Sequence, residues 1–443
     1  MKGKLNLHRL AMGSKIAVAV ILTILILTAG GWASEKVLYT FTGGDSGEYP
    51  QRPLAQDAAG NLYGTAVDGG STNYCSPGCG VVFELTRNSN GSWTESVIHT
   101  FMGGSEDGAT PQAGVTLDSK GNLYGTTSRG GPGVCLIFNI DIGCGIVYKL
   151  SPEAGGTWKE TMIYAFTGGS DGGDPLSGVI FDSQGNLYGT GAQWGIVIGC
   201  PGHLYGCGTV FELTPAVSGS WTETTIHEFT GEDGDGSAPV QPLTFDQHGN
   251  IYGTTYNGGI ASNACPDGCG TLFKLTPTPG GGWNYNVSYR FGHSVTDAAI
   301  PGGPVIFDAQ GNLYDWAGGG TYGYGTIVRL TPHTGGTWTE SILYNFEGGP
   351  TDGAGPDSLI LASDGKLYGT TAQGANSACE YGCGAVFQLT PSDSGMWTET
   401  LPYLFDGSNG EYPNGFIAAP HGSFYGVVSG GSGGYGMVYQ FTP

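Results

Sequence analysis

The chain is poor in positive charge: its 443 residues include only 15 Lys and Arg, against 37 Asp and Glu. Nucleic acids and anionic membrane surfaces are bound through basic patches, so this composition argues against both as partners. A net charge of −22 favours a soluble protein. Although Gly is abundant, no Gly-X-Y period exists, which excludes a collagen-like chain. Convincing helical periodicity is also missing after residue 33.

Long apolar runs are scarce, and the one at the N-terminus is short. Thirteen residues, 16–28, follow a leader that carries four basic side chains, Lys2, Lys4, Arg9 and Lys15. A membrane span needs about 20 residues, whereas this pattern is typical of a secretory signal peptide. Because residues 31–33 fit a cleavage site, we expect residues 1–33 to be removed. The rest would then be secreted (periplasmic, cell-surface or extracellular) without membrane attachment. An uncleaved anchor is the alternative.

A repeat of about sixty residues fills the remaining chain. The string Gly-Asn-Leu-Tyr-Gly-Thr occurs three times unchanged and four times with substitutions, at 60–65, 121–126, 185–190, 249–254, 311–316, 365–370 and 422–427. Each copy carries four short strand-like runs, and two of these alternate with period two. Four antiparallel strands joined by hairpins form a propeller blade. The sequence therefore predicts an all-β fold, with residues 34–443 forming a single seven-bladed β-propeller.

The two ends of the repeat array complement each other. Residues 36–41 match the fourth strand of a blade, and the chain ends at 437–443 on the third strand of the seventh copy. An open solenoid is the alternative architecture, but it would need capping repeats, and none is visible. We expect residues 36–41 to pair with residues 437–441, because a closed ring has no exposed edge.

Ten cysteines fall in five close pairs, each between the second and third strands of a copy. The second Cys of each pair lies in a Gly-Cys-Gly triplet, and the two copies that have Gly-Tyr-Gly instead lack both cysteines. This joint presence or absence predicts disulfides, which persist in exported proteins. Zinc is the alternative, since Cys-x3-Cys resembles half a tetrahedral site. The predicted disulfides are Cys75–Cys79, Cys135–Cys144, Cys200–Cys207, Cys265–Cys269 and Cys379–Cys383.

The loops that bear cysteines share a face with the loops that enter each new blade, and that face is where propeller loops converge on the channel. The entering loops repeat an acidic residue, at Asp107, Asp171, Asp235, Asp297 and Asp352. These carboxylates could hold Ca²⁺ at the channel mouth. Alternatively, they form Asx-type turns with the backbone. Ser46 and Asn409 occupy the same position in the other two copies and would keep a turn bond without the charge. The substitutions favour the turn and leave Ca²⁺ a weak candidate, with no other cofactor expected.

Catalytic constellations are missing from the sequence. Gly-x-Ser-x-Gly occurs at 168–172 and 430–434, but neither lies between a strand and a helix, as a nucleophile elbow requires. The residues expected to line the channel offer no acid–base pair and no clustered metal ligands. The Trp that begins each fourth strand recurs in every full copy, which indicates packing. We therefore expect no catalytic residues.

Two neighbouring loops break the symmetry with apolar residues. The loop of the second copy, 134–142, and that of the third copy, 194–205, are apolar where the other loops are polar. They either pack on each other or form a partner-binding patch. The candidate ligand-binding residues are Phe138, Trp194 and Tyr205.

The repeated strings Gly-Asn-Leu-Tyr-Gly-Thr, Gly-Cys-Gly-Thr-Val-Phe-x-Leu-Thr-Pro and Trp-Thr-Glu resemble the GloVer tandem repeat of exported bacterial proteins. The resemblance covers residues 35–443. It implies a secreted or cell-surface setting and no established enzymatic role, and it assigns no catalytic residues.

These observations predict a secreted, monomeric, non-enzymatic binding or scaffold module whose ligand is an extracellular polysaccharide or protein. The alternative is a propeller hydrolase, lactonase or lyase that acts on sugars or sugar acids and could use Ca²⁺, and it rests on analogy between folds. An enzyme should break its symmetry with polar residues, whereas this chain breaks it with apolar ones. The pattern therefore favours binding.

Overall fold

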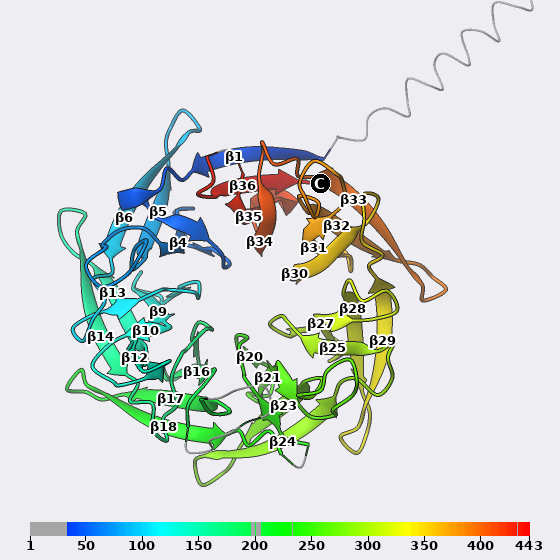
Figure 1. Ribbon diagram of the computed structural model, residues 1–443, viewed down its shortest axis with the longest axis horizontal. Helices are drawn as coiled ribbons and strands as arrows, with labels where there is room; N and C mark the ends of the chain where they lie inside the picture. The colour runs from blue at the N-terminus through cyan, green and yellow to red at the C-terminus, as the bar shows by residue number, and fades with distance from the viewer. Residues whose placement is uncertain (1–32, 196–199, 201–204, 233, 432) are drawn as a thin grey trace, which may run out of the picture.

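The computed structural model describes residues 33–443 except 196–199, 201–204, 233 and 432. Seven sheets of four or five strands stand around a central axis and form a closed ring (Figure 1). The predicted seven-bladed β-propeller is confirmed. The predicted signal peptide lies outside the described residues except for Ala33. Within the described ranges, none of the helices has the length and hydrophobicity needed to cross a membrane.

Each blade is an antiparallel sheet whose strands follow one another outward from the central channel in chain order, except that the N-terminal β1 is the outermost strand of blade 7. From the innermost strand outward, the blades are: blade 1, β2 (Glu48–Pro50) with β3 (Ala55–Gln56), β4 (Leu62–Asp68), β5 (Val81–Arg87), β6 (Trp93–Thr100); blade 2, β8 (Thr116–Leu117), β9 (Leu123–Thr127), β13 (Ile146–Pro152), β14 (Trp158–Ala165); blade 3, β15 (Ile180–Phe181), β16 (Leu187–Gly191), β17 (Thr209–Pro215), β18 (Trp221–Glu228); blade 4, β20 (Thr244–Phe245), β21 (Ile251–Thr255), β23 (Thr271–Pro277), β24 (Trp283–Arg290); blade 5, β25 (Ala298–Pro301) with β26 (Ile306–Phe307), β27 (Leu313–Gly319), β28 (Thr326–Pro332), β29 (Trp338–Asn345); blade 6, β30 (Gly353–Leu361), β31 (Leu367–Gly374), β32 (Ala385–Pro391), β33 (Trp397–Leu404); and blade 7, β34 (Glu411–Ala418), β35 (Phe424–Gly430), β36 (Met437–Thr442), β1 (Ser34–Thr40).

Short elements lie in the loops. Three two-stranded ribbons pair β7 (Gly108–Ala109) with β10 (Arg129–Gly130), β11 (Leu136–Ile137) with β12 (Ile140–Asp141), and β19 (Gly236–Ser237) with β22 (Asn257–Gly258). Two 3-10 turns are η1 (Gly44–Ser46) and η2 (Pro420–Gly422).

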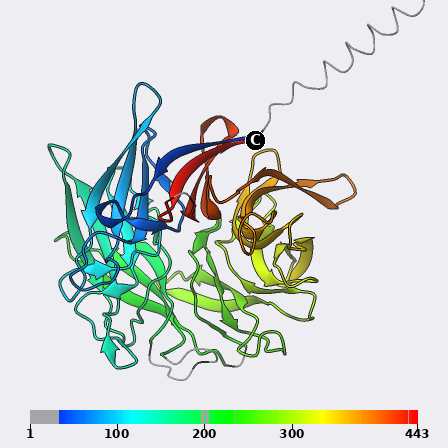
Figure 2. The same cartoon turned by 45° about the horizontal axis from the view of Figure 1, so that its top comes forward.

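The ring closes through the N-terminal strand, as predicted. β1 pairs antiparallel with β36, with Lys36 opposite Gln440 and Thr40 opposite Met437. Figures 1 and 2 show blue β1 lying beside red β36 in both views. The last blade thereby gains its outer strand, and the pairing removes the open edge that β36 would otherwise present.

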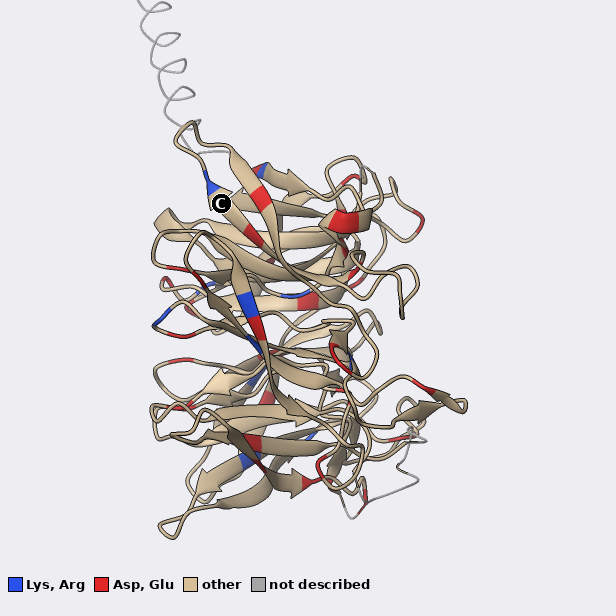
Figure 3. Ribbon diagram, turned by 90° about the vertical axis from the view of Figure 1, so that its left-hand side faces the viewer, with Lys and Arg blue, Asp and Glu red and all other residues tan. Residues whose placement is uncertain are grey.

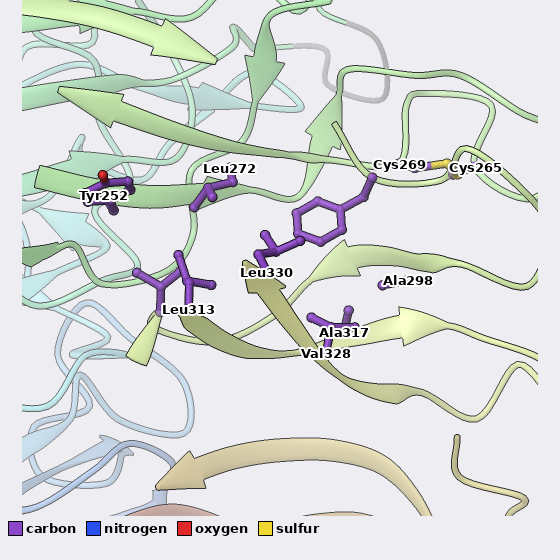
Figure 4. Packing of buried hydrophobic residues seen from close by; sticks show 11 residues of the cluster. Tyr252, Cys265, Cys269, Leu272, Ala298, Leu313, Ala317, Val328 and Leu330 are labelled. Atoms are coloured by element: carbon purple, nitrogen blue, oxygen red, sulfur yellow. A yellow bond between two sulfur atoms is a disulfide. The ribbon is translucent and has the colours of Figure 1, made fainter. Parts of the chain in front are cut away.

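The core lies between neighbouring blades. The cluster that joins blades 4 and 5 is typical: Tyr252, Leu272 and Phe291 pack against Leu313, Val328 and Leu330 (Figure 4). The Gly of the repeated Leu-Tyr-Gly in the second strand leaves room for a large aromatic ring on the third strand. In blade 1, for example, a Cβ on Gly64 would lie 2.5 Å from the ring of Phe83. In blade 5 both members change, to Asp315 opposite Val328. The smaller Val leaves the space that Asp315 fills.

The first-strand prolines show how one blade locks onto the next. In all seven blades the Gly that follows the Cys or Tyr of the triplet has a positive φ and would carry a Cβ against the Pro that opens the next blade, as Gly325 does against Pro356. Its carbonyl accepts a hydrogen bond from the backbone N–H of the Phe that directly follows the fourth strand, at 3.0 Å for Phe346. The close approach of the Pro leaves no room for a side chain at this Gly. We call the contact between the last Gly of the triplet and the Pro of the next blade the triplet joint.

The repeated Trp of the fourth strand packs on the preceding blade, as predicted. Each ring meets the second-strand Tyr of that blade edge to face, for example Trp221 with Tyr124 at 6.4 Å between centroids and Trp283 with Tyr188 at 5.5 Å. Such contacts stabilise beyond the area they bury. These tryptophans are therefore structural.

Candidate functional site

Five disulfides hold the loops between the second and third strands of blades 1, 2, 3, 4 and 6. Their Cα–Cα distances are 5.0, 5.1, 5.4, 5.2 and 5.2 Å for Cys75–Cys79, Cys135–Cys144, Cys200–Cys207, Cys265–Cys269 and Cys379–Cys383. The predicted pairing is confirmed. None of the described cysteines is free to bind zinc. We call the side of the ring that carries these loops the disulfide-loop face.

The loop of blade 2 on this face forms a hairpin. Leu136 pairs with Asp141 and Ile137 with Ile140, and the two-residue turn between them is Phe138-Asn139, with φ of +51° and +64°. Positive φ at both central positions is the geometry of a type I′ turn, which normally takes Asn or Gly rather than Phe. A bulky residue in that conformation is unusual.

The base of the hairpin is firmly held. One carboxylate oxygen of Asp141 accepts hydrogen bonds from the backbone N–H of Cys135, at 3.2 Å, and of Gly143, at 3.1 Å. The Cys135–Cys144 disulfide closes the same loop. The hairpin is thus a small rigid projection from blade 2.

The three predicted ligand-binding residues come together but play different parts. Trp194 is 9% exposed and packs in one cluster with Cys135 and Cys144. Tyr205 stacks on Trp194 at 6.0 Å between centroids, and its hydroxyl accepts a hydrogen bond of 3.4 Å from the backbone N–H of Phe138. The two loops therefore pack on each other through Trp194 and Tyr205. Their neighbours Ile196, Val197, Ile198 and Leu204 lie outside the described residues.

Phe138, in contrast, is 82% exposed at the tip of the hairpin. Val134, Leu136 and Ile140 around it are also exposed. Leu136 pairs with Asp141 and Ile140 pairs with Ile137, so Leu136 and Ile140 point to opposite faces of the hairpin, with Phe138 at the turn between them. Several exposed apolar side chains on one short hairpin make it a candidate interaction site. We call these four residues the Phe138 hairpin patch.

The recurring acidic residues of the entering loops bond to backbone and to outer strands. Asp107 accepts from Met102 N–H at 2.7 Å, Asp297 from Ser294 N–H at 2.8 Å, and Asp352 from Glu347 N–H at 2.7 Å. Ser46 and Asn409 accept the same kind of bond. The side chain reaches three to five residues back along the chain, not two residues on as in the expected Asx turn. It closes the loop all the same.

Outer-strand side chains complete the surroundings of these carboxylates. Tyr164 donates to Asp171 at 2.9 Å, and His227 lies 3.5 Å from Asp235. Burial raises the pKa of Asp235, but hydrogen bonds from His227 and Tyr285 outweigh it and hold that pKa at about 2. In the described part of the chain, no three His, Cys, Asp or Glu side chains come together as a metal site would require. Calcium binding by Asp107, Asp171, Asp235, Asp297 or Asp352 stays an untested prediction.

The central channel narrows to a cavity of about 80 Å³ lined by residues of all seven blades. Its lining includes the polar side chains Gln51, Ser177 and Gln241. It also brings together Arg52 and Asp357, which are far apart in sequence. Burial raises the pKa of Asp357 to about 6, and the charge of Arg52 partly opposes that rise. Ligand pockets usually measure about 300–1,000 Å³, so this cavity suits a few water molecules.

The sequence is similar to one known family. The family model of the Gloeobacter/Verrucomicrobia repeat matches three overlapping stretches, residues 23–194, 78–316 and 259–443. No curated protein matches the chain. A putative oxidoreductase (glucose dehydrogenase) from Thermus thermophilus is a structural neighbour at 13% identity, covering 93% of this chain and 100% of that one, with a TM-score of 0.39. A similarity this low supports no conclusion about activity. The matched stretches together span the propeller, so the chain belongs to the Gloeobacter/Verrucomicrobia repeat family.

Proposed function

We propose that this protein is an exported, non-enzymatic binding module that holds its partner on the disulfide-loop face. The observation that carries the proposal is the Phe138 hairpin patch, in which an exposed aromatic side chain lies on a turn with positive φ. The Cys135–Cys144 disulfide and the hydrogen bonds of Asp141 hold the base of that turn. Burying a Phe side chain contributes about 1.5–3 kcal/mol, so covering Phe138 with a partner would add that much to the free energy of binding. Because the hairpin is already ordered, binding would cost little conformational entropy.

Export is supported by the disulfides. Five such bonds persist in oxidising compartments and are rare in the cytosol. The signal peptide at residues 1–33 remains a prediction from the sequence. Fractionation of the source organism would distinguish the periplasm, the cell surface and the extracellular medium as the location of the exported chain.

The enzymatic alternative, a hydrolase, lactonase or lyase acting on sugars or sugar acids, draws less support from the described residues. The channel is the position where the blades converge, and the described lining of its cavity holds a single carboxyl group, Asp357, with one guanidinium, Arg52. Its volume of about 80 Å³ is too small for a sugar ring. Sustained turnover of a sugar lactone that EDTA abolishes would overturn the binding proposal.

A glycan array and a pull-down with purified candidate proteins test the proposal, run with the wild type and Phe138→Ser. We expect Phe138→Ser to weaken the detected interaction at least tenfold, since truncating a central aromatic anchor costs about 2 kcal/mol. Met396→Ser is the matched control, because Met396 is 71% exposed in a turn on the opposite face. Trp194 is unsuitable for this test, since its ring is buried and its loss would disturb the loops. Unchanged binding by Phe138→Ser would show that the patch assignment is wrong.

A further inference from the structure

We propose that the disulfide-loop face binds a neutral polysaccharide, held in two grooves between neighbouring loops. This inference rests on the proposed function for the statement that this face meets a ligand. It adds the chemical class of the ligand and the residues that select it.

The first groove lies between the loops of blades 1 and 2 and has a volume of about 520 Å³. One wall is Tyr74, which is 75% exposed, and the other is Ile140 of the Phe138 hairpin patch, 66% exposed. The Cys75–Cys79 disulfide fixes the Tyr74 wall, and the Asp141 bonds fix the hairpin wall. The groove is thus bounded by apolar surfaces that do not have to be ordered on binding.

Charged side chains of both signs line the same groove. The Arg129 side chain is exposed, and its positive charge opposes the rise in the pKa of both Asp68 and Asp174. Asp68 also lines the groove, and burial, followed by the charge of Glu48, raises the pKa of its carboxyl while Arg129 opposes the rise. Guanidinium donors and carboxylate acceptors therefore meet the same space, which suits a ligand that both donates and accepts.

A second groove of about 650 Å³ repeats this construction between blades 5 and 6. Tyr324, 50% exposed, and Tyr381, 63% exposed, form its walls. Gln373 is the counterpart of Arg129, since each directly precedes the Gly that pairs with the loop entering its blade. The exposed Glu380 is the one charged residue among the described residues that line this groove, so it contains acceptors and amide donors but no cation.

Charge argues against an anionic ligand. Only Arg129 among the described lining residues of both grooves is positive, and carboxylates accompany it. The whole chain carries a net charge of −22. Figure 3 shows Lys and Arg as a few isolated segments among Asp and Glu on the side that faces the viewer. An acidic polymer would be repelled, whereas a neutral one would not.

A saccharide fits what remains. Sugar rings present an apolar C–H face that packs on aromatic rings, and their hydroxyl groups donate and accept as the groove side chains require. Two similar grooves on one rigid ring favour a repeating polymer, because once one groove is filled the second contact is intramolecular. Grooves on the opposite face, beside Trp283 and Trp338, are lined by the repeat's own structural rings.

Isothermal titration of the full chain tests the inference, with linear glucan, mannan, xylan and galactan fragments and with the parent polymers as probes. We expect one neutral class to bind. Tyr74→Ala and Tyr381→Ala should each lower the affinity for the polymer at least fivefold, and the double variant should lower it more than either single variant. Arg129→Gln should lower the affinity for fragments that fill the first groove. Met396→Ala, on the opposite face, should leave the affinity unchanged.

Failure of the inference can be told apart from failure of the proposed function. If no neutral saccharide binds, or if Tyr74→Ala and Tyr381→Ala bind as the wild type does, the inference is wrong. Preferential binding of a uronate or sulfated polymer would overturn the neutral class. If a purified protein binds in a Phe138-dependent way while every saccharide fails, the inference falls and the proposed function stands.

Discussion

The triplet joint makes a sharp prediction at Gly325, in a blade without a disulfide. Gly325 has φ of +100°, and a Cβ placed on it would overlap Cδ of Pro356 in the next blade. Gly323, two residues earlier, has φ of +77°, and a Cβ there would meet nothing within 4 Å. A side chain at Gly323 would therefore meet only the cost of a positive φ, whereas one at Gly325 would also meet the contact with Pro356.

The expected magnitudes follow from these two facts. Gly323→Ala should lose about 1 kcal/mol of unfolding free energy, the cost of a Cβ at positive φ. Gly325→Ala should lose that amount plus about 1–3 kcal/mol for overpacking. The difference between the two variants sets an upper bound on the energy of the joint, because φ of +100° at Gly325 lies farther from the left-handed region than φ of +77° at Gly323 and adds backbone strain of its own.

Denaturation in guanidinium chloride, followed by intrinsic tryptophan fluorescence, measures the effect as a shift of the midpoint. Equal midpoints for Gly323→Ala and Gly325→Ala would refute the reasoning, since the contact with Pro356 would then have no energetic weight. A larger loss for Gly323→Ala would refute it more strongly.

Three further changes have defined outcomes. Burial raises the pKa of Glu340 from 4.5 to about 7, although the N–H of Ala298 opposes the rise and the charge of Asp297 adds to it, so the stability that protonated Glu340 contributes is present below pH 4.5 and is lost as pH rises through 7. The free energy of unfolding should therefore fall by at most about 3 kcal/mol over that window, and by less in Glu340→Gln. An identical pH profile for Glu340→Gln would contradict this origin. Deleting residues 34–42 should expose the edge of β36 and yield an aggregated product by size-exclusion chromatography, and a stable monomer would count against ring closure through β1. Replacing Cys379 and Cys383 together by Ser should lower unfolding free energy by roughly 2 kcal/mol, because the bond closes a short loop, and peptide mapping without reduction should recover this pair intact in the wild type.

Blade number, strand order and ring closure followed from the sequence because the same four-strand pattern recurs seven times at a spacing of about sixty residues. Four runs per copy predict one sheet, and the mismatch between the two ends predicts how the ring closes. The cysteines paired as predicted because both partners were present or absent in the same copy. These inferences depended on comparing copies within one chain.

The triplet joint was missed, although a signal was present. The second Gly of the triplet is retained in the copies that have lost their cysteines, at Gly325 and Gly436, so it could not serve the disulfide alone. The residue before each first-strand Pro was also missed: it has a positive φ in every blade, even where it is Thr110 or Ile300. Non-Gly residues rarely adopt that conformation, so nothing in the local residues indicated it.

The candidate site was predicted only as a region. Apolar residues in neighbouring loops look alike in sequence, and only packing separates buried Trp194 from exposed Phe138. Arg129 escaped notice because the sequence alone does not show which side chains line a groove. The effect of the Arg52 charge on the Asp357 carboxyl depends on how side chains of blades 1 and 6 are oriented in the channel, which the repeat pattern does not specify.

Hydrogen exchange followed by mass spectrometry, with and without a saturating neutral polysaccharide, tests the central claim most directly, because it maps the face that meets the ligand. We expect protection in the loops at 69–80, 129–145 and 374–384, and unchanged exchange in the opposite turns at 87–92 and 391–396. Protection confined to the opposite turns or to the channel strands would contradict binding at the disulfide-loop face.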